Sequence, residues 1–317
     1  MKKLFSKIIM FLSVWILVLI SFDLSKIVKN GNCDIKAYWI QNIVGKTYDI
    51  AFVGDSRVLY MCDPVFFEGK LDKKVINLGN YGTGYDGMYI ILNDFLKNND
   101  LDMVFLQVDF ASLNSKKYFG DSLRLYEYLP IIYNDSYSEI LKSKVSFLKY
   151  YFFKALPNSI YVEFLPEVLI NKRVLSYVLN NKFCKSEVFD KYGGFDPFAY
   201  GDREFDIGSK VVDSFTSNDY DLFYLHKLVE FCLKKNIEVV LFTPPYSDKF
   251  YSNIADKKIF YGLVDDFVSR YNLKYYDFNS IVSLRENTLF ADSTHMNRFG
   301  VKSFSESLGQ VFDGSYQ

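Results

Sequence analysis

The sequence has almost no net charge, few cysteines and only two histidines. Lys and Arg total 37 and Asp and Glu total 38 among 317 residues, with no basic cluster in the body of the chain. Because the chain carries no net positive charge that would attract nucleic acid, we expect no nucleic-acid partner. The cysteines lack C-x-x-C spacing, which excludes a zinc site and a dense disulfide framework. We expect Cys232 to be a buried helix residue, leave one disulfide among Cys33, Cys62 and Cys184 open, and predict no cofactor.

Hydrophobic and aromatic residues are abundant. Half of the residues are hydrophobic, and 31 are Phe and 26 are Tyr. A chain of this length and composition can bury a sizeable core in one large domain or two small ones. The aromatic excess has two readings: an AT-rich codon bias, or a tyrosine-rich cleft that suits sugars and other amphiphilic ligands.

The N-terminal segment predicts a membrane anchor. Leu4–Leu24 is apolar apart from three serines, Lys7 and Asp23, and as a helix it spans roughly 30 Å, the thickness of a bilayer core. Lys2, Lys3 and Lys7 predict that the N-terminus lies in the cytoplasm. A cleaved signal peptide is the alternative, but no small-x-small cleavage site follows. A buried core helix fits less well, because the segment is apolar all round.

This reading divides the chain into residues 1–30, a cytoplasmic tip with a single signal anchor, and residues 31–317, which lie outside the cytoplasm of a bacterium. The second part alternates apolar strand-like runs with amphipathic helical segments. Such alternation predicts an α/β fold, a three-layer α/β/α sandwich with a parallel sheet. The expected strands are 49–53, 74–77, 102–108, 238–243 and 274–278, and the expected helices are 34–46, 89–96, 220–235, 254–271 and 298–312.

Residues from about 112 to 218 do not follow this alternation. Helical patterns are expected at 123–133, 137–156 and 168–180, followed by a glycine-containing loop at 191–197. We interpret this block as a helical insertion over the carboxyl edge of the sheet, where open α/β folds bind ligands.

A candidate nucleophile follows the first predicted strand. Gly54-Asp55-Ser56 comes directly after a buried apolar run, so Ser56 is expected at the carboxyl edge of the sheet and at the start of a helix. The helix dipole and the free backbone N–H groups there favour a developing negative charge. An N-cap serine is the structural alternative.

One of the two histidines belongs to an Asp-x-x-His segment near the other end of the chain. Asp292 and His295 can converge within one turn or a tight loop. A carboxylate that accepts a hydrogen bond from Nδ1–H of an imidazole leaves the Nε2 lone pair free to accept a proton from a nucleophile, as in Ser-His-Asp chemistry. The alternative is a surface loop before a helix capped by Asn297. The other histidine, His226, is expected to be a surface or packing residue.

Gly54–Ser56 and Asp292–His295 resemble the first and last sequence blocks of the SGNH/GDSL hydrolase superfamily, over roughly residues 48–110 and 219–315. The resemblance implies Ser56 as nucleophile, His295 as general base and then acid, and Asp292 as its orienting carboxylate. It also implies an oxyanion hole formed by the backbone N–H groups of Ser56 and Gly82, with Gly79 as the fallback.

The chain departs from that superfamily after the third strand. It has Gln107-Val108-Asp109 in place of Gly-x-Asn-Asp, so one oxyanion donor is absent, a loss that typically costs about 10²–10³ in rate. With its anchor and Ser56-Arg57, the chain looks like the membrane-anchored subgroup of cell-surface acylation, similar to alginate O-acetylation proteins and the teichoic acid D-alanyl transfer protein. That subgroup implies a multispanning membrane acyltransferase as partner.

The resemblance and the anchor together predict serine-dependent transfer of an acyl group, expected to be acetyl, to a cell-surface polysaccharide or cell-wall polymer. A carbohydrate O-acetyl esterase and a non-catalytic scaffold for a membrane acyltransferase are the alternatives. The candidate substrate-binding residues are Arg57, Asp109 and Tyr246, of which the last two come at strand ends. Arg57 either steers an anionic acceptor or pairs with an acid, and the alternative for Tyr246, which we favour, is a residue of a structural loop.

Overall fold

The computed structural model describes residues 36–113, 135–155, 186–197 and 219–312, with a few short stretches and single positions elsewhere (5–7, 10, 11, 13, 14, 128, 215, 217 and 314). The chain forms two compact units, one of residues 1–41 and 121–186 and one of residues 42–120 and 187–317. Each is described by itself.

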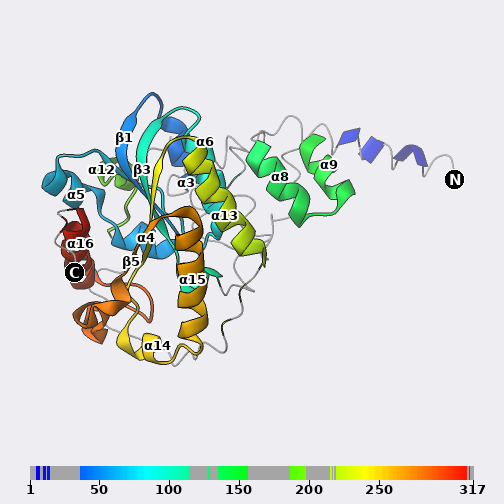
Figure 1. The fold of residues 1–317 in the computed structure, drawn as a ribbon. Helices are drawn as coiled ribbons and strands as arrows, with labels where there is room; N and C mark the ends of the chain where they lie inside the picture. Colours follow the sequence, from blue (N-terminus) through cyan, green and yellow to red (C-terminus); the bar gives the residue numbers. More distant parts are fainter. Residues whose placement is uncertain are drawn as a thin grey trace. The chain divides into compact units, whose positions relative to one another are not determined.

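The second unit is built on a five-stranded sheet in which every neighbouring pair is parallel. The strand order is β2-β1-β3-β4-β5 (Figure 1). The predicted α/β class and parallel sheet are confirmed, and each expected strand lies within three residues of its observed bounds. These are β1 Thr47–Val53, β2 Val75–Asn77, β3 Asp100–Gln107, β4 Glu238–Thr243 and β5 Lys274–Asp277.

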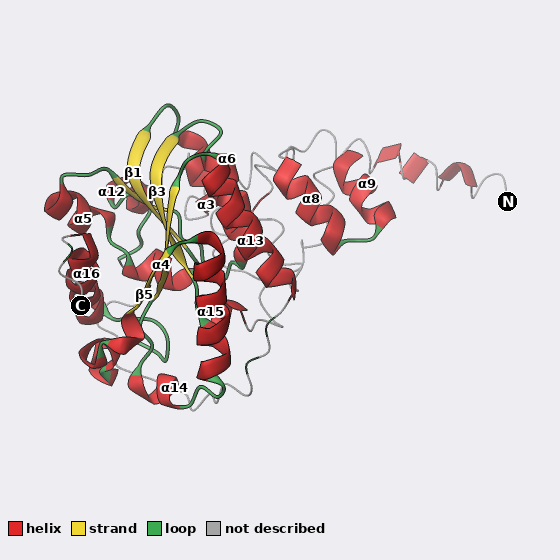
Figure 2. Cartoon of the chain, in the orientation of Figure 1, coloured by secondary structure: helices red, strands yellow, loops and turns green. Residues whose placement is uncertain are grey.

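Helices cover both faces of the sheet (Figures 1 and 2). Figure 1 shows α5 (Pro64–Leu71) and α16 (Arg298–Phe312) on one side and α6 (Tyr85–Phe95), α13 (Asp219–Lys234) and α15 (Lys257–Tyr271) on the other. Because both faces are covered, the central strands are continuously apolar over residues 50–53, 103–106 and 239–242 rather than alternating. Phe52 of β1 lies beside Phe105 of β3, with ring centroids 5.7 Å apart, and Phe105 lies 6.1 Å from Phe242 of β4.

The strand order has a switch point at β1. The chain leaves β1 for β2 on one side and later returns to β3 on the other. In open α/β sheets, ligands bind outside the carboxyl ends of the strands at such a point. The carboxyl ends of β1 and β3, Val53 and Gln107, therefore mark the expected location of a site.

Several helix boundaries differ from the sequence-based expectation. The helix expected over 34–46 is, in its described part, α3 (Lys36–Trp39) followed by the 3₁₀ helix Ile40–Asn42. Helix α6 begins at Tyr85 rather than at residue 89, after the extended Gly84. The segment expected as one helix over 254–271 contains α15 only from Lys257, because Asp256 has left-handed backbone angles (φ 54°), and a separate short helix, α14 (Asp248–Ser252), precedes it. Helix α5, which begins with Pro64 after the capping residue Asp63, was not predicted.

Part of the predicted insertion belongs to the sheet unit. Helix α12 (Glu187–Lys191) is followed by a turn whose Gly193 carbonyl accepts a hydrogen bond from the backbone N–H of Asn77 in β2 (2.8 Å). The Asp196 N–H donates to the carbonyl of Leu59, 3.2 Å away. These bonds fix residues 193–196 beside the strand and helix that follow the first motif.

The first unit contains, within its described residues, α3 (Lys36–Trp39), α8 (Asp135–Lys144) and α9 (Phe147–Ala155). The single helix expected over 137–156 is two helices. The first ends at Lys144 and the second begins at Phe147, directly after Ser146, a residue type that favours the N-cap position. Ser138 of α8 and Tyr150 of α9 are joined by a 2.7 Å hydrogen bond between their hydroxyls.

Several predictions fall outside the described residues. Most of the expected anchor Leu4–Leu24 does, as do the expected helix at 168–180 and nearly all of that at 123–133. Among the positions described, no helix is both long and apolar enough to cross a membrane. Cys232 is buried in α13 as expected, and both it and Cys62 are free thiols, whereas Cys33 and Cys184 lie outside the described part.

Candidate active site

Ser56 is the first residue of helix α4 (Ser56–Met61), directly beyond the carboxyl end of β1. Asp55 is the N-cap: its Oδ1 accepts a hydrogen bond from the backbone N–H of Arg57 at 2.8 Å. Gly54 is needed for close packing, because a Cβ there would lie 2.2 Å from Cγ2 of Val58 and 2.3 Å from Oε1 of Gln107. The Ser56 N–H belongs to the first turn, whose N–H groups have no partner within their own helix.

His295 and Asp292 lie in a tight loop between the residues Phe290 and Met296, which pair as an isolated antiparallel bridge. Oδ1 of Asp292 accepts the backbone N–H groups of Thr294 (2.8 Å) and His295 (2.9 Å). This Asx-type turn folds the carboxylate back onto the imidazole. Oδ2 of Asp292 lies 2.8 Å from Nδ1 of His295.

The loop and the serine turn meet across the sheet edge. Oγ of Ser56 and Nε2 of His295 are 2.8 Å apart, although the residues are separated by 239 positions in the sequence. With its Nδ1 proton directed to Asp292, the imidazole offers the lone pair of Nε2 to the serine hydroxyl. The structure therefore brings together the three residues for which the sequence predicts a triad.

The electrostatics of Asp292 suit this arrangement. Burial raises the pKa of its carboxyl group, but the hydrogen bond and charge of His295 and the two backbone N–H donors outweigh burial and lower the pKa to about 2. Asp292 is therefore ionised at neutral pH. Its side chain is 37 % exposed and that of His295 is 14 % exposed, so both can be reached from solvent.

Neighbouring elements hold the histidine loop in place. Ser247, the N-cap of α14, donates its hydroxyl hydrogen to the carbonyl of Ser293 at 3.0 Å. Asn297 caps α16, accepting the N–H groups of Phe299 and Gly300 on Oδ1, and its Nδ2 donates to the carbonyl of Thr288. The ring of Tyr60, from α4, stands edge-on to His295 with centroids 6.0 Å apart.

The three candidate substrate-binding residues contact one another beneath the site. Arg57 forms an ion pair with Asp109, donates through Nη2 to the carbonyls of Pro244 (2.6 Å) and Pro245 (2.8 Å), and lies 3.8 Å from the ring centre of Tyr246. Arg57 is 2 % exposed, and Asp109 and Tyr246 are fully buried. Arg57 therefore pairs with an acid, which was one of its two expected roles. Direct substrate contact by these three residues is not supported, because their side chains offer almost no surface to a ligand.

Gln107, which the sequence analysis did not single out as a site residue, connects this buried network to the serine turn. Its Oε1 accepts the backbone N–H of Asp55 at 3.0 Å, and its Nε2 donates to Oδ2 of Asp109 at 2.5 Å. Burial raises the pKa of Asp55, the negative charge of Asp109 raises it further, and Arg57 opposes both. The signal in the sequence was a polar side chain directly after the apolar run 103–106, at the carboxyl end of β3.

The structure distinguishes between the two glycines expected to donate an N–H group to the oxyanion. The fallback Gly79 is unsuitable, because its N–H already donates to Oδ1 of Asn77 at 2.8 Å. The loop that contains Gly82 does reach the serine turn, since the Asn80 N–H donates to the carbonyl of Gly54 at 3.1 Å. Gly82 itself has left-handed backbone angles (φ 56°) that glycine adopts readily. Its assignment as a donor stays a prediction.

His226 is remote from this chemistry and packs between two helices. Its Nδ1 lies 2.8 Å from the hydroxyl of Tyr271, and its ring lies 4.7 Å from that of Phe267 in α15. Burial, followed by the charge of Arg270, lowers the pKa of His226. The expected packing position is confirmed.

Comparisons with known proteins give only distant structural likeness. No protein-family model and no curated protein matches the sequence. One similar structure is described as a "putative acylhydrolase" from Bacteroides fragilis, with 11% identity, a TM-score of 0.40 and coverage of 86% of this chain and 88% of that one. Another is described as a "putative platelet activating factor" from Streptococcus pneumonia, with 12% identity, a TM-score of 0.42 and coverage of 96% and 98%. Because both TM-scores are low, fold and site rest on the geometry above.

Proposed function

We propose that this chain is a serine-dependent acyl-ester enzyme in which Ser56 is the nucleophile. The observation on which this rests is the continuous path from Ser56 Oγ to His295 Nε2 (2.8 Å) and from His295 Nδ1 to Asp292 Oδ2 (2.8 Å). A serine hydroxyl is a weak nucleophile until an adjacent base accepts its proton. Both distances are within hydrogen-bond reach, as general-base catalysis requires.

In the proposed mechanism, His295 takes the hydroxyl proton as Ser56 Oγ bonds to the carbonyl carbon of an acyl ester. The negative charge that develops on the carbonyl oxygen is stabilised by the N–H of Ser56, at the N-terminus of α4, and by that of Gly82. His295 then returns the proton to the departing alcohol, which leaves an acyl-Ser56 ester. A second hydroxyl, deprotonated by His295, attacks this ester and regenerates the serine.

The identity of that second hydroxyl separates transfer from hydrolysis. We propose transfer, with acetyl as the acyl group and a cell-surface polysaccharide or cell-wall polymer as the acceptor. The apolar segment Leu4–Leu24 motivates the proposed single-pass anchor with the body of the protein outside the cytoplasm. In this setting a multispanning membrane acyltransferase is the proposed partner that delivers the acyl group.

Hydrolysis is the second candidate, because the exposure of His295 and Asp292 admits water to the site. Purified protein incubated with p-nitrophenyl acetate distinguishes the two reactions. Fast release of p-nitrophenol in buffer alone would favour an O-acetyl esterase. Slow release that added glycan accelerates would favour transfer, since the glycan hydroxyl then resolves the acyl-enzyme faster than water.

A cellular experiment tests the proposal as a whole. Replacing the chromosomal copy by Ser56→Ala should lower the O-acyl content of surface polymers to that of a deletion strain. The matched control is Ser143→Ala in α8, since the Ser143 hydroxyl donates only within its own helix, to the carbonyl of Ile140 at 2.7 Å. Unchanged O-acyl content would overturn the transfer proposal. A fluorophosphonate probe that fails to label wild-type protein at Ser56 would instead favour a non-catalytic scaffold.

A further inference from the structure

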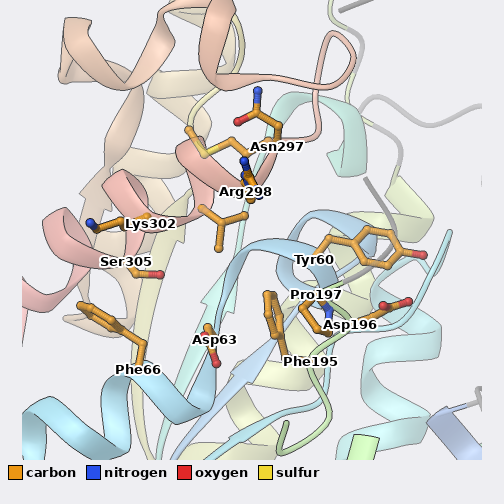
Figure 3. A pocket seen from close by; sticks show the side chains of 12 residues that line it. Tyr60, Asp63, Phe66, Phe195, Asp196, Pro197, Asn297, Arg298, Lys302 and Ser305 are labelled. Carbon is orange, nitrogen blue, oxygen red and sulfur yellow. The ribbon is translucent and has the colours of Figure 1, made fainter. Parts of the chain in front are cut away.

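A pocket beside the histidine loop is not used by the proposed triad chemistry. It has a volume of about 250 Å³ and lies within the sheet unit (Figure 3). Two of its lining residues connect it to the triad: Met296 follows His295 in the chain, and Tyr60 stands edge-on to the His295 ring at 6.0 Å. Helix α16 supplies another wall. The pocket therefore adjoins the imidazole that would deprotonate an acceptor hydroxyl.

The pocket contains a buried hydroxyl that has no hydrogen-bond partner among the described residues. Ser305 of α16 is 2 % exposed, and its Oγ is unpaired. Figure 3 shows Ser305 on the pocket wall near Phe66 and Asp63, with its hydroxyl directed toward the other lining side chains. Buried polar groups are normally paired, so an unpaired hydroxyl lining a cavity indicates a ligand that carries hydroxyl or similar groups.

The charges that line the pocket balance one another. Arg298 and Lys302 lie on α16, while Asp63 and Asp196 lie on the segments opposite. Asp63 caps α5 with Oδ1, which accepts the N–H of Val65 at 3.0 Å, and an ionised carboxylate has further acceptor positions. Two cations and two carboxylates give no net attraction for a strongly charged ligand. They provide donors and acceptors for neutral polar groups.

The remaining lining is aromatic and aliphatic. Phe66, Phe195 and Tyr60 present ring surfaces, and Pro197 and Val301 add apolar contact. A pocket that is largely apolar with a few placed polar groups binds a compact ligand with one apolar face and polar edges. The volume is below the roughly 300–1,000 Å³ of drug-sized sites, which restricts the ligand to about one ring.

We infer that this pocket is a subsite for one neutral pyranose ring of the acceptor. The C–H face of a sugar ring would pack on Phe66 and Phe195, and its hydroxyls would pair with Ser305 and Asp63. An acyl chain fits less well, because it would desolvate Ser305 and Asp63 without replacing their hydrogen bonds. The inference deepens the proposed function and rests on it: the subsite would hold the acceptor while an adjacent hydroxyl of the same glycan approaches acyl-Ser56.

Saturation-transfer NMR on the full chain in detergent micelles tests this inference. The probes are methyl β-D-glucopyranoside and N-acetylglucosamine, with glycerol 3-phosphate as a charged polyol and hexanoate as an acyl mimic. We expect the sugars to bind in the millimolar range and the other two not to bind. Binding of hexanoate or of glycerol 3-phosphate alone would overturn the inference in favour of an acyl or phosphate site.

Two variants locate the binding. Ser305→Ala removes the unpaired hydroxyl and should weaken sugar binding about 2- to 10-fold, the range for one hydrogen bond. Val301→Phe fills the pocket from a partly exposed position and should abolish binding. Ser307→Ala is the matched control on the same helix, since the Ser307 hydroxyl donates to the carbonyl of Ser303 instead. Sugar binding that is unchanged in both pocket variants would contradict the inference.

Failure of the sugar subsite can be distinguished from failure of the proposed Ser56 chemistry. Sugar binding should persist in Ser56→Ala, because the subsite does not depend on the nucleophile. Wild-type protein that reacts with a fluorophosphonate at Ser56 but binds neither sugar would overturn the subsite alone. Protein that binds sugar through Ser305 but never reacts at Ser56 would overturn the proposed reaction and leave the subsite standing.

Discussion

The side chain of Gln107 holds the backbone of Asp55: its Oε1 accepts the Asp55 N–H at 3.0 Å, one residue before the proposed nucleophile. The same amide donates to Asp109, which pairs with Arg57. The serine turn is thus fixed from below by side chains of β3 as well as by its own helix. A residue that acts in this way positions the nucleophile and does not touch the substrate.

Replacing Gln107 by Leu should therefore affect both stability and reactivity. It leaves the buried Asp55 N–H without its partner and removes one of the two donors to Oδ2 of Asp109, the other being Arg57, which should lower the free energy of unfolding by about 1–3 kcal/mol. Labelling of Ser56 by a fluorophosphonate should slow in the protein that remains folded. Gln310→Leu, at an exposed position of α16, is the control and should change neither quantity. Equal labelling rates in Gln107→Leu and wild type would show that Gln107 is structural only.

The buried ion pair makes a second prediction. Arg57→Met leaves the carboxylate of Asp109 buried without its cation, and breaking such a pair typically costs about 3–5 kcal/mol. The double variant Arg57→Met/Asp109→Leu removes both charges and should be more stable than the single variant. Chemical unfolding of all three proteins measures this. A double variant less stable than Arg57→Met would contradict the account of the pair.

Gly54 should not tolerate a side chain. A Cβ at this position would overlap Val58 and Gln107, so Gly54→Ala must displace either helix α4 or the side-chain amide of Gln107 in β3. We expect a loss of about 1–3 kcal/mol, the usual cost of overpacking, together with slower labelling of Ser56. Gly262→Ala is the matched control: a Cβ in that part of α15 meets nothing within 4 Å, and the change should stabilise the helix by about 0.5–1 kcal/mol.

The low pKa of Asp292 predicts a pH-dependent contribution to stability. Because the folded-state pKa of about 2 is below the ordinary value of 3.8, the ionised carboxylate stabilises the folded state above about pH 4, and this contribution is lost as the pH falls toward 2. The difference in unfolding free energy between wild type and Asp292→Asn should therefore shrink over that interval. A difference that stays constant from pH 6 to pH 2 would contradict this.

At neutral pH Asp292→Asn should also lower kcat by about 10⁴, because the imidazole loses its oriented tautomer.

The strands and the two separate motifs, Gly54–Ser56 and Asp292–His295, could be predicted from the sequence because each depends on a local pattern. A continuous apolar run that ends at Gly54 specifies a buried strand and the turn after it, and Asp292 and His295 are close in the chain. Strand order and the meeting of Ser56 with His295 depend on long-range packing, for which the resemblance alone supplied the expectation.

The buried network was not predictable in the same way. Arg57, Asp109 and Tyr246 lie shortly after the carboxyl ends of three adjacent strands, β1, β3 and β4, and therefore looked like candidates for a surface cleft. Their burial follows from the ion pair with Asp109 and from the Pro244 and Pro245 carbonyls, which satisfy the guanidinium inside the protein. A charged residue is expected at the surface unless such partners exist, and the sequence does not reveal them. Helix α5 was missed for a related reason, because Asp63-Pro64 reads equally as a turn.

Intact-mass spectrometry of the protein mixed with p-nitrophenyl acetate and quenched in acid detects acylation of the nucleophile itself. We expect a transient species heavier by one acetyl group, which peptide mapping locates on Ser56 and which His295→Ala and Ser56→Ala do not form. A matched His226→Ala variant should still form it, because His226 is a residue of α13 that packs against Tyr271 and Phe267 of α15, remote from Ser56. No acetylated species in the wild type, or an acetyl group on another residue that persists in Ser56→Ala, would contradict the claim that Ser56 is the nucleophile.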